Sequence, residues 1–278
     1  MPAGLLGAGL LLLFAASLAL SIRADEPPPP SPATESLSEA DREEIRDLER
    51  ESERGDIRYF RSRFVFKVDA KRKPGDATST RLRLEGVEAF GEKNRFSYQL
   101  KVPTYYNEAP GSYVTGLGDV SFELAAVLGA TDWLFHGAGV EVTLQTASDP
   151  VLWGGATTVK PEYGLAALLG HQILAQFVLQ FTQSVLTLPE APAVQKLEPE
   201  LYLNVHLPWF TLSFDWDNWW DFPAGAFGQT LKVGASQSVD REKRWVVGVS
   251  YLFPLNDYAR STDLGTFGLT VTRHLGRK

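Results

Sequence analysis

Apolar and polar residues alternate with a period of two along most of the chain after residue 57. In the segment 95–102, for example, Phe, Tyr, Leu and Val hold the even positions, and Arg, Ser, Gln and Lys hold the odd ones. This period is typical of β-strands that have one apolar and one polar face. About twelve segments are predicted to be such strands: 58–70, 80–90, 95–103, 118–128, 133–145, 159–168, 172–184, 197–207, 210–217, 228–239, 244–253 and 265–274.

The connections between these segments alternate in length. Short turns are expected at 91–94, 129–132, 170–171, 208–209 and 240–243, and long loops at 71–80, 104–117, 146–158, 186–196, 218–227 and 254–264. A soluble β-sandwich also alternates apolar and polar residues, so alternation alone leaves both folds open. Short turns on one side, long loops on the other and an even strand count favour an all-β, antiparallel up-and-down transmembrane β-barrel of about 12 strands over 57–278.

One segment, 163–181, also fits an apolar helix of membrane-spanning length, because its glutamines at 172, 176 and 180 would share one helix face. Those glutamines equally share one face of a strand. We favour two strands joined at 170–171, because a single helical span has no place among the surrounding hairpins.

The first 56 residues differ in composition from the rest. The apolar run 5–20 predicts a secretory signal peptide at 1–24. A proline-rich linker and an acidic helix are expected at 25–56, where Ser36 and Glu39 match a capping box. This part holds 12 acidic and 4 basic residues, whereas 57–278 holds 22 of each. We expect a solvated periplasmic helix; the alternative is that residues 36–54 bind a periplasmic partner or enter a pore.

Composition and motifs exclude several kinds of chemistry. The chain has no cysteine, which excludes disulfides and thiolate sites, and its net charge of −7 argues against nucleic-acid binding. The four histidines lack metal-ligand spacing, and neither a Gly-x-Ser-x-Gly elbow nor a His-x-Ser-Asn-Gly stretch occurs. The acidic and aromatic cluster 214–221 could gather oxygens for calcium, but lumen carboxylates beside an aromatic girdle are favoured. We therefore expect no enzyme, no metal and no cofactor.

The polar faces of the predicted strands supply candidate residues that line the lumen and set its selectivity. Rings of charged side chains control ion preference in pores. The candidates are Arg95, Gln99, Lys101, Glu123, Glu141, Gln172, Gln176, Gln180, Glu200, Asn204, Asp215, Asp217 and Lys232.

Several short motifs resemble one family. They are Val-Pro at 102–103, Gly-Leu-Gly-Asp at 116–119, Leu-Gln-Thr-Ala at 144–147, a Trp-Gly-Gly loop at 153–155, Lys-Pro at 160–161 and the stretch 245–257. Together they resemble the meta-pathway phenol-degradation family of outer-membrane proteins. The resemblance implies an outer-membrane barrel regarded as a transporter, and it implies no catalytic residue. Such barrels usually end on an aromatic residue, whereas this chain ends His-Leu-Gly-Arg-Lys.

These observations predict a channel in the outer membrane of a Gram-negative bacterium. It would contact outer-membrane lipid and admit small solutes, including hydrophobic or aromatic ones, by passive diffusion past a polar lumen. A barrel of this size can also fill its interior with side chains. One alternative is therefore a closed structural or adhesive barrel that binds a partner through its loops or N-terminal helix, and another is a soluble periplasmic β-sandwich or hydrolase.

Overall fold

The computed structural model describes residues 60–275, apart from 132, 150, 151, 153–155, 171, 188–192, 241 and 242. The predicted signal peptide, linker and acidic helix, and the Trp-Gly-Gly loop, lie outside these residues. In chain order the elements are β1 (Arg63–Arg72), β2 (Thr78–Phe90), the 3₁₀ turn η2 (Glu92–Asn94), β3 (Phe96–Ala109), β4 (Ser112–Leu117), β5 (Ser121–Ala130), β6 (Leu134–Thr143), β7 (Ala156–Leu169), β8 (Ile173–Thr187), β9 (Gln195–His206), β10 (Thr211–Asp221), β11 (Ala226–Ser238), β12 (Trp245–Pro254), the short helix α3 (Asp257–Arg260) and β13 (Gly265–His274).

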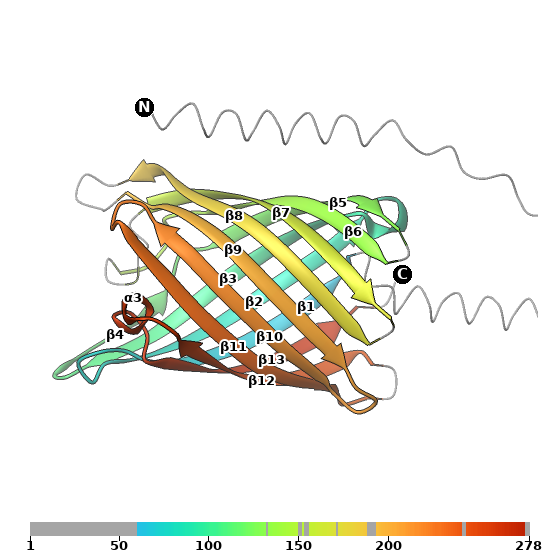
Figure 1. Ribbon diagram of the computed structural model, residues 1–278. Helices are drawn as coiled ribbons and strands as arrows, with labels where there is room; N and C mark the ends of the chain where they lie inside the picture. The colour runs from blue at the N-terminus through green and yellow to red at the C-terminus, as the bar shows by residue number, and fades with distance from the viewer. Residues whose placement is uncertain are drawn as a thin grey trace, which may run out of the picture. The chain divides into compact units, whose positions relative to one another are not determined.

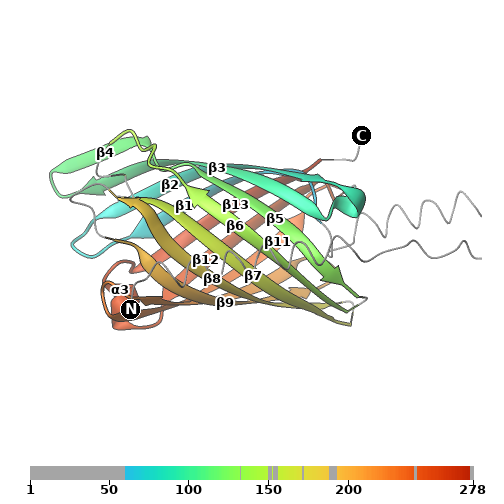
Figure 2. The ribbon, with the colours of Figure 1, turned by 90° about the horizontal axis from the view of Figure 1, so that it is seen from above.

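These strands form one antiparallel sheet that closes on itself (Figures 1 and 2). Closure is made by β1 and β13, which pair from Arg63 opposite His274 to Arg72 opposite Gly265. The strand β3 pairs first with β5 and then, in its second half, with β4, so β4 and β5 occupy one position in the sheet. The result is a twelve-stranded up-and-down barrel, as predicted.

Each predicted strand segment overlaps one strand of the barrel. The segment 163–181 forms parts of β7 and β8, whose turn contains Gly170 with a φ of 66°. The prediction of two strands is confirmed, and the helical alternative is wrong. The described residues contain no helix that is long and apolar enough to cross a membrane.

Two predicted long loops are mostly strand. The segment 104–117 contains the end of β3 and all of β4, which form a hairpin that extends the sheet. The segment 218–227 shrinks to a turn at 222–225, because β10 and β11 pair as far as Asp221 and Ala226. In both segments the strands continue past the residues that alternate regularly between apolar and polar, and backbone hydrogen bonds between neighbouring strands hold them in place. The prediction of loops there was wrong.

The apolar side chains of the barrel point outward. Exposed large ones on the strands include Phe64, Leu84, Phe177, Val249 and Phe267, and they lie on the positions that alternate with inward-facing residues. The buried side chains include polar and charged ones such as Ser79, Glu85, Gln180 and Asp215. This arrangement is the reverse of that in a soluble sandwich, where two sheets enclose an apolar core. It is the arrangement of a transmembrane barrel.

Both ends of the described chain lie at the end of the barrel that carries the short turns. Leu275, which follows β13, donates its N–H to the carbonyl of Ser62, which precedes β1, at 2.9 Å. The opposite end, called the loop end below, carries the β3–β4 hairpin and α3 (Figures 1 and 2).

Candidate functional site: the barrel lumen

The strand register places most of the predicted lumen residues on the inner face of the barrel. One row runs across four strands, with Gln99 opposite Glu123, Glu123 opposite Glu141 and Glu141 opposite Lys160. Residues on the same level of neighbouring strands point to the same face of the sheet.

A second row crosses four strands on the other side of the barrel. Gln176 lies opposite Tyr202, Tyr202 opposite Asp215 and Asp215 opposite Lys232. By the same alternation, the inner face also carries Lys101, Gln180, Glu200, Asn204 and Asp217.

Two predicted lumen residues lie at the short-turn end instead. Gln172 lies in the β7–β8 turn with an exposed side chain, because β8 begins only at Ile173. Arg95 precedes β3 and donates to the carbonyls of Val127 and Leu128 at 3.3 and 3.1 Å, so its guanidinium holds the neighbouring strand end.

Lys101 joins carboxylates from two neighbouring strands. Its Nζ lies 2.8 Å from Glu123 Oε2 and also contacts Glu141. Glu141 lies 3.6 Å from Lys160 as well. These side chains are largely shielded from water, which strengthens the ion pairs relative to pairs on an open surface. They tie β3, β5, β6 and β7 together across the inner face.

A second network spans β8 to β11. Glu200 accepts hydrogen bonds from Tyr202 and from Gln180, the latter at 3.3 Å. Next to it, Lys232 forms an ion pair with the buried Asp215. Asp215 of the 214–221 cluster thus pairs with a side chain of the neighbouring strand, whereas Asp217 Oδ1 is buried and has no hydrogen-bond partner among the described residues.

The third carboxylate of that cluster lies at the loop end. Asp221 lies 3.6 Å from Lys196 and accepts a hydrogen bond from Tyr258 at 3.0 Å. Burial and this carboxylate both raise the pKa of Tyr258. The described residues contain no group of three or more His, Asp or Glu side chains that could hold a metal ion.

The β12–β13 connection, which contains α3, folds against inward-facing residues at the loop end. The ring of Tyr258 lies 6.5 Å from that of Trp219, and Asp263 lies 3.2 Å from Lys71. Asn256 caps α3 by accepting from the N–H of Ala259 at 3.0 Å, and Ala259 is fully buried. This connection therefore lies against the inner face of the barrel at the loop end.

The basic inner face of β1 and β2 was not among the predicted lumen residues. The odd positions of these strands include Arg63, Lys67, Lys71, Arg81 and Arg83. Their register places them together, with Lys67 opposite Arg83 and Asp69 opposite Arg81. The alternation in the predicted segments 58–70 and 80–90 was the signal that could have identified them.

Charge is unevenly divided between the two halves of the inner face. Within the described strands, the half formed by β1–β3 and β11–β13 carries the bases Arg63, Lys67, Lys71, Arg81, Arg83, Lys101 and Lys232 and the acids Asp69 and Glu85. The half formed by β5–β10 carries the acids Glu123, Glu141, Glu162, Glu198, Glu200, Asp215, Asp217 and Asp221 and the bases Lys160 and Lys196. We call these the basic half and the acidic half. Since each half is a contiguous set of strands, a basic wall faces an acidic wall across the lumen.

Comparison with known proteins finds similarity at the level of structure. No protein-family model matches the chain, and no curated protein sequence matches it. The COG4313 outer membrane channel from Pseudomonas putida F1 superposes with a TM-score of 0.66 at 13% identity, covering 78% of this chain and 96% of that one. The NanC porin superposes with a TM-score of 0.55 at 10% identity, covering 76% of this chain and all of that one. The chain therefore has the closed twelve-stranded fold of outer-membrane barrels.

Proposed function

We propose that the protein is a channel of the Gram-negative outer membrane that admits small solutes by passive diffusion. The observation that carries this proposal is the closed barrel whose outer face is apolar and whose inner face is lined by charged side chains. An apolar exterior suits lipid, and a charged interior suits water and polar solutes. The two similar barrels are named as a channel and a porin, which supports the same conclusion.

The resemblance of the short motifs to the meta-pathway phenol-degradation family suggests hydrophobic or aromatic solutes. The inner face carries many charges, and a charged side chain that a solute approaches must either stay hydrated or pair with a polar group of that solute. The lumen therefore favours solutes that also carry a polar or charged group. An aromatic ring with one polar substituent meets both conditions.

The side chains proposed to control selectivity are those of the two halves. The basic half attracts anions and the acidic half attracts cations, so a solute with separated charges would orient across the lumen. We further propose that residues 25–56 form a solvated segment in the periplasm; the alternative is that they bind a partner or enter the pore.

Planar-bilayer conductance of the purified protein, with and without residues 25–56, tests this function. We expect discrete conductance steps in the full chain. A larger conductance after deletion would identify the segment as a plug, whereas equal conductance would leave it as a solvated segment or one that binds a partner. If neither form conducts, the channel function is refuted.

The β3–β4 hairpin favours a second candidate, a barrel that binds a partner at the loop end. Its rings Tyr106 and Tyr113 stack with centroids 6.3 Å apart, and Tyr113 is 70% exposed. Exposed tyrosines are common in binding surfaces. This candidate predicts no conductance from either form of the protein, together with binding that is lost when both tyrosines are replaced by serine.

A further inference from the structure

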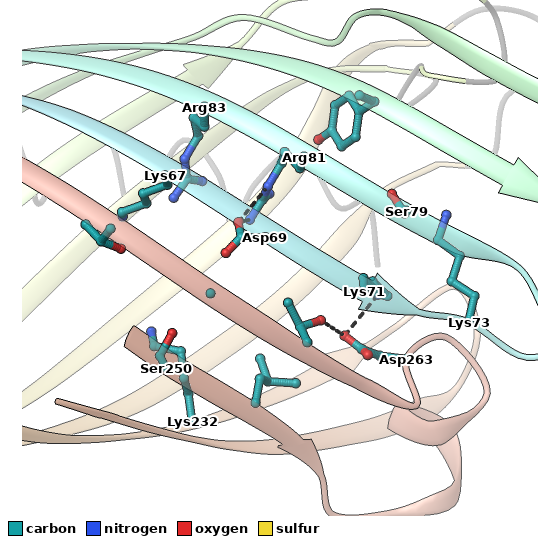
Figure 3. Close-up of a pocket in the computed structure, with 15 residues that line it drawn as sticks. Lys67, Asp69, Lys71, Lys73, Ser79, Arg81, Arg83, Lys232, Ser250 and Asp263 are labelled. Carbon is teal, nitrogen blue, oxygen red and sulfur yellow. Dashed lines mark hydrogen bonds and ion pairs between the residues drawn. The ribbon is translucent and has the colours of Figure 1, made fainter. Parts of the chain in front are cut away.

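A cavity of about 430 Å³ lies on the basic half of the inner face (Figure 3). It extends from the middle of the barrel towards the loop end, between β1, β2, β11, β12 and β13, with Tyr105 of β3 at its side. Its volume falls in the range of small-molecule sites, about 300–1,000 Å³. Its basic lining residues are Lys67, Lys71, Lys73, Arg81, Arg83 and Lys232.

Only two acidic residues, Asp69 and Asp263, are found among the described residues that line this cavity, and both are already occupied. Asp69 Oδ2 accepts from Arg81 Nε and Nη2 at 3.0 and 2.6 Å. Asp263 lies 3.2 Å from Lys71 and accepts from the N–H of Gly265 at 2.7 Å and from the hydroxyl of Thr266 at 2.9 Å. Neither carboxylate can balance a further cation.

Of the remaining bases, Lys232 is paired with Asp215, while the other three share one carboxylate or have none. Lys67 and Arg83 both contact Glu85 Oε1, at 3.2 and 2.7 Å. Lys73 forms no ion pair with any residue that the structure describes, and burial together with the charge of Lys71 lowers its pKa. The cavity therefore holds more positive charge than its own carboxylates neutralise.

From this arrangement we infer that the cavity binds a small oxyanion, either a carboxylate or a phosphate group. Arginine and lysine donors arranged around a common space are the usual partners of such groups. The labelled side chains in Figure 3 reach this space from several strands, which gives an oxyanion donors on more than one side. Tyr105 and Leu252 add surface for the rest of an organic acid.

This inference rests on the proposed channel function, and it names the class of solute that the lumen selects. An oxyanion would enter at the loop end, exchange water for these donors and leave towards the short-turn end. Binding weakens as salt is added, because salt screens charges that water can reach.

Isothermal titration calorimetry on the full chain in detergent micelles tests the site. The probes are benzoate, inorganic phosphate and, as a neutral compound of similar shape, benzyl alcohol. We expect saturable binding of at least one anion and none of benzyl alcohol. Tighter binding of benzoate identifies a carboxylate ligand, and tighter binding of phosphate identifies a phosphate ligand.

The decisive variant is Lys67→Gln combined with Lys73→Gln. Loss of two charged donors should weaken binding about tenfold or more. Lys73→Gln alone should weaken anion binding several-fold. Because Lys73 forms no ion pair with the described residues, this single variant should fold normally, and it keeps the test valid if the double variant misfolds. The matched control is Lys243→Gln, an exposed lysine in the β11–β12 turn at the other end of the barrel, which should bind as the unaltered chain does.

Three results would overturn the site: neither anion binds, benzyl alcohol binds as tightly as the tighter of the two anions, or the double variant binds with unchanged affinity. Conductance measured on the same preparation separates the two proposals. Conductance without anion binding refutes the site and retains the channel, whereas anion binding without conductance refutes the channel and retains the site.

Discussion

Placing a charge on the outer face of the barrel should cost free energy that depends on depth in the membrane. Leu84 is the middle residue of the 13-residue strand β2, and its side chain is 60% exposed on the outer face. Phe90 ends the same strand on the same face, six positions further on. At about 3.4 Å per residue and a strand tilt of about 40°, Phe90 lies about 15 Å in height from Leu84. It is therefore near the edge of an apolar band about 25 Å tall.

Each arginine variant is compared with alanine at the same position, which removes the effect of losing the native side chain. Leu84→Arg should be less stable than Leu84→Ala by about 2–4 kcal/mol, and Phe90→Arg less stable than Phe90→Ala by about 0–1 kcal/mol. The assay is reversible urea unfolding from phospholipid vesicles, followed by tryptophan fluorescence. A difference below about 0.5 kcal/mol at Leu84, typical of a surface in water, would refute the assignment of this face to lipid.

Three further predictions concern packing, acid stability and selectivity. Gly228→Ala should destabilise the barrel by about 1–3 kcal/mol in the same assay, because a Cβ at this position would lie 2.0 Å from the ring of Trp219. The control Gly86→Ala should be tolerated, because its Cβ would lie 3.6 Å from Phe64, at an ordinary contact distance. Asp240 accepts the N–H groups of Trp245 and Arg244 at 2.7 and 3.0 Å, and these lower its pKa. The stabilising effect of the Asp240 carboxylate is therefore present above the unfolded-state pKa of about 3.9 and is lost as pH falls through the lower folded-state pKa. Asp240→Asn should reduce the melting temperature at pH 7. If the variant melts below the unaltered chain by the same amount at strongly acidic pH, this explanation is contradicted. Glu162→Gln combined with Glu198→Gln removes two carboxyl groups from the acidic half, so the reversal potential in a salt gradient at pH 9 should shift towards anion preference. The shift should be larger at 0.1 M than at 1 M salt because the Debye length falls from about 10 to about 3 Å; no shift at low salt would count against a role of these side chains in selectivity.

The sequence was sufficient to predict the barrel because lipid and lumen impose opposite preferences on neighbouring residues. In β3 this produces Phe96, Tyr98 and Leu100 on one face and Ser97, Gln99 and Lys101 on the other. The β3–β4 hairpin lacks such a signal. It extends the sheet beyond the regularly alternating part of β3, so its strands could not be told from a loop.

The lumen was only partly predictable for two reasons. Gln172 continues the spacing of the glutamines in β8, but spacing cannot show where a turn ends and a strand begins. The division into a basic and an acidic half depends on which strands are neighbours after closure. Lys67 and Lys232 are far apart in the chain, and only the pairing of β1 with β13 brings them to one cavity.

Solutes are proposed to cross through the lumen, and because the chain contains no cysteine, single introduced cysteines can test this path directly. Ser250 lines the cavity on the inner face, and its neighbour Val249 is 47% exposed on the outer face. Single variants Ser250→Cys and Val249→Cys are placed in a planar bilayer and treated with a bulky methanethiosulfonate reagent. If solutes and ions cross through the lumen, conductance falls in Ser250→Cys and stays constant in Val249→Cys. Unchanged conductance of a fully labelled Ser250→Cys, or an equal fall in both variants, would contradict it.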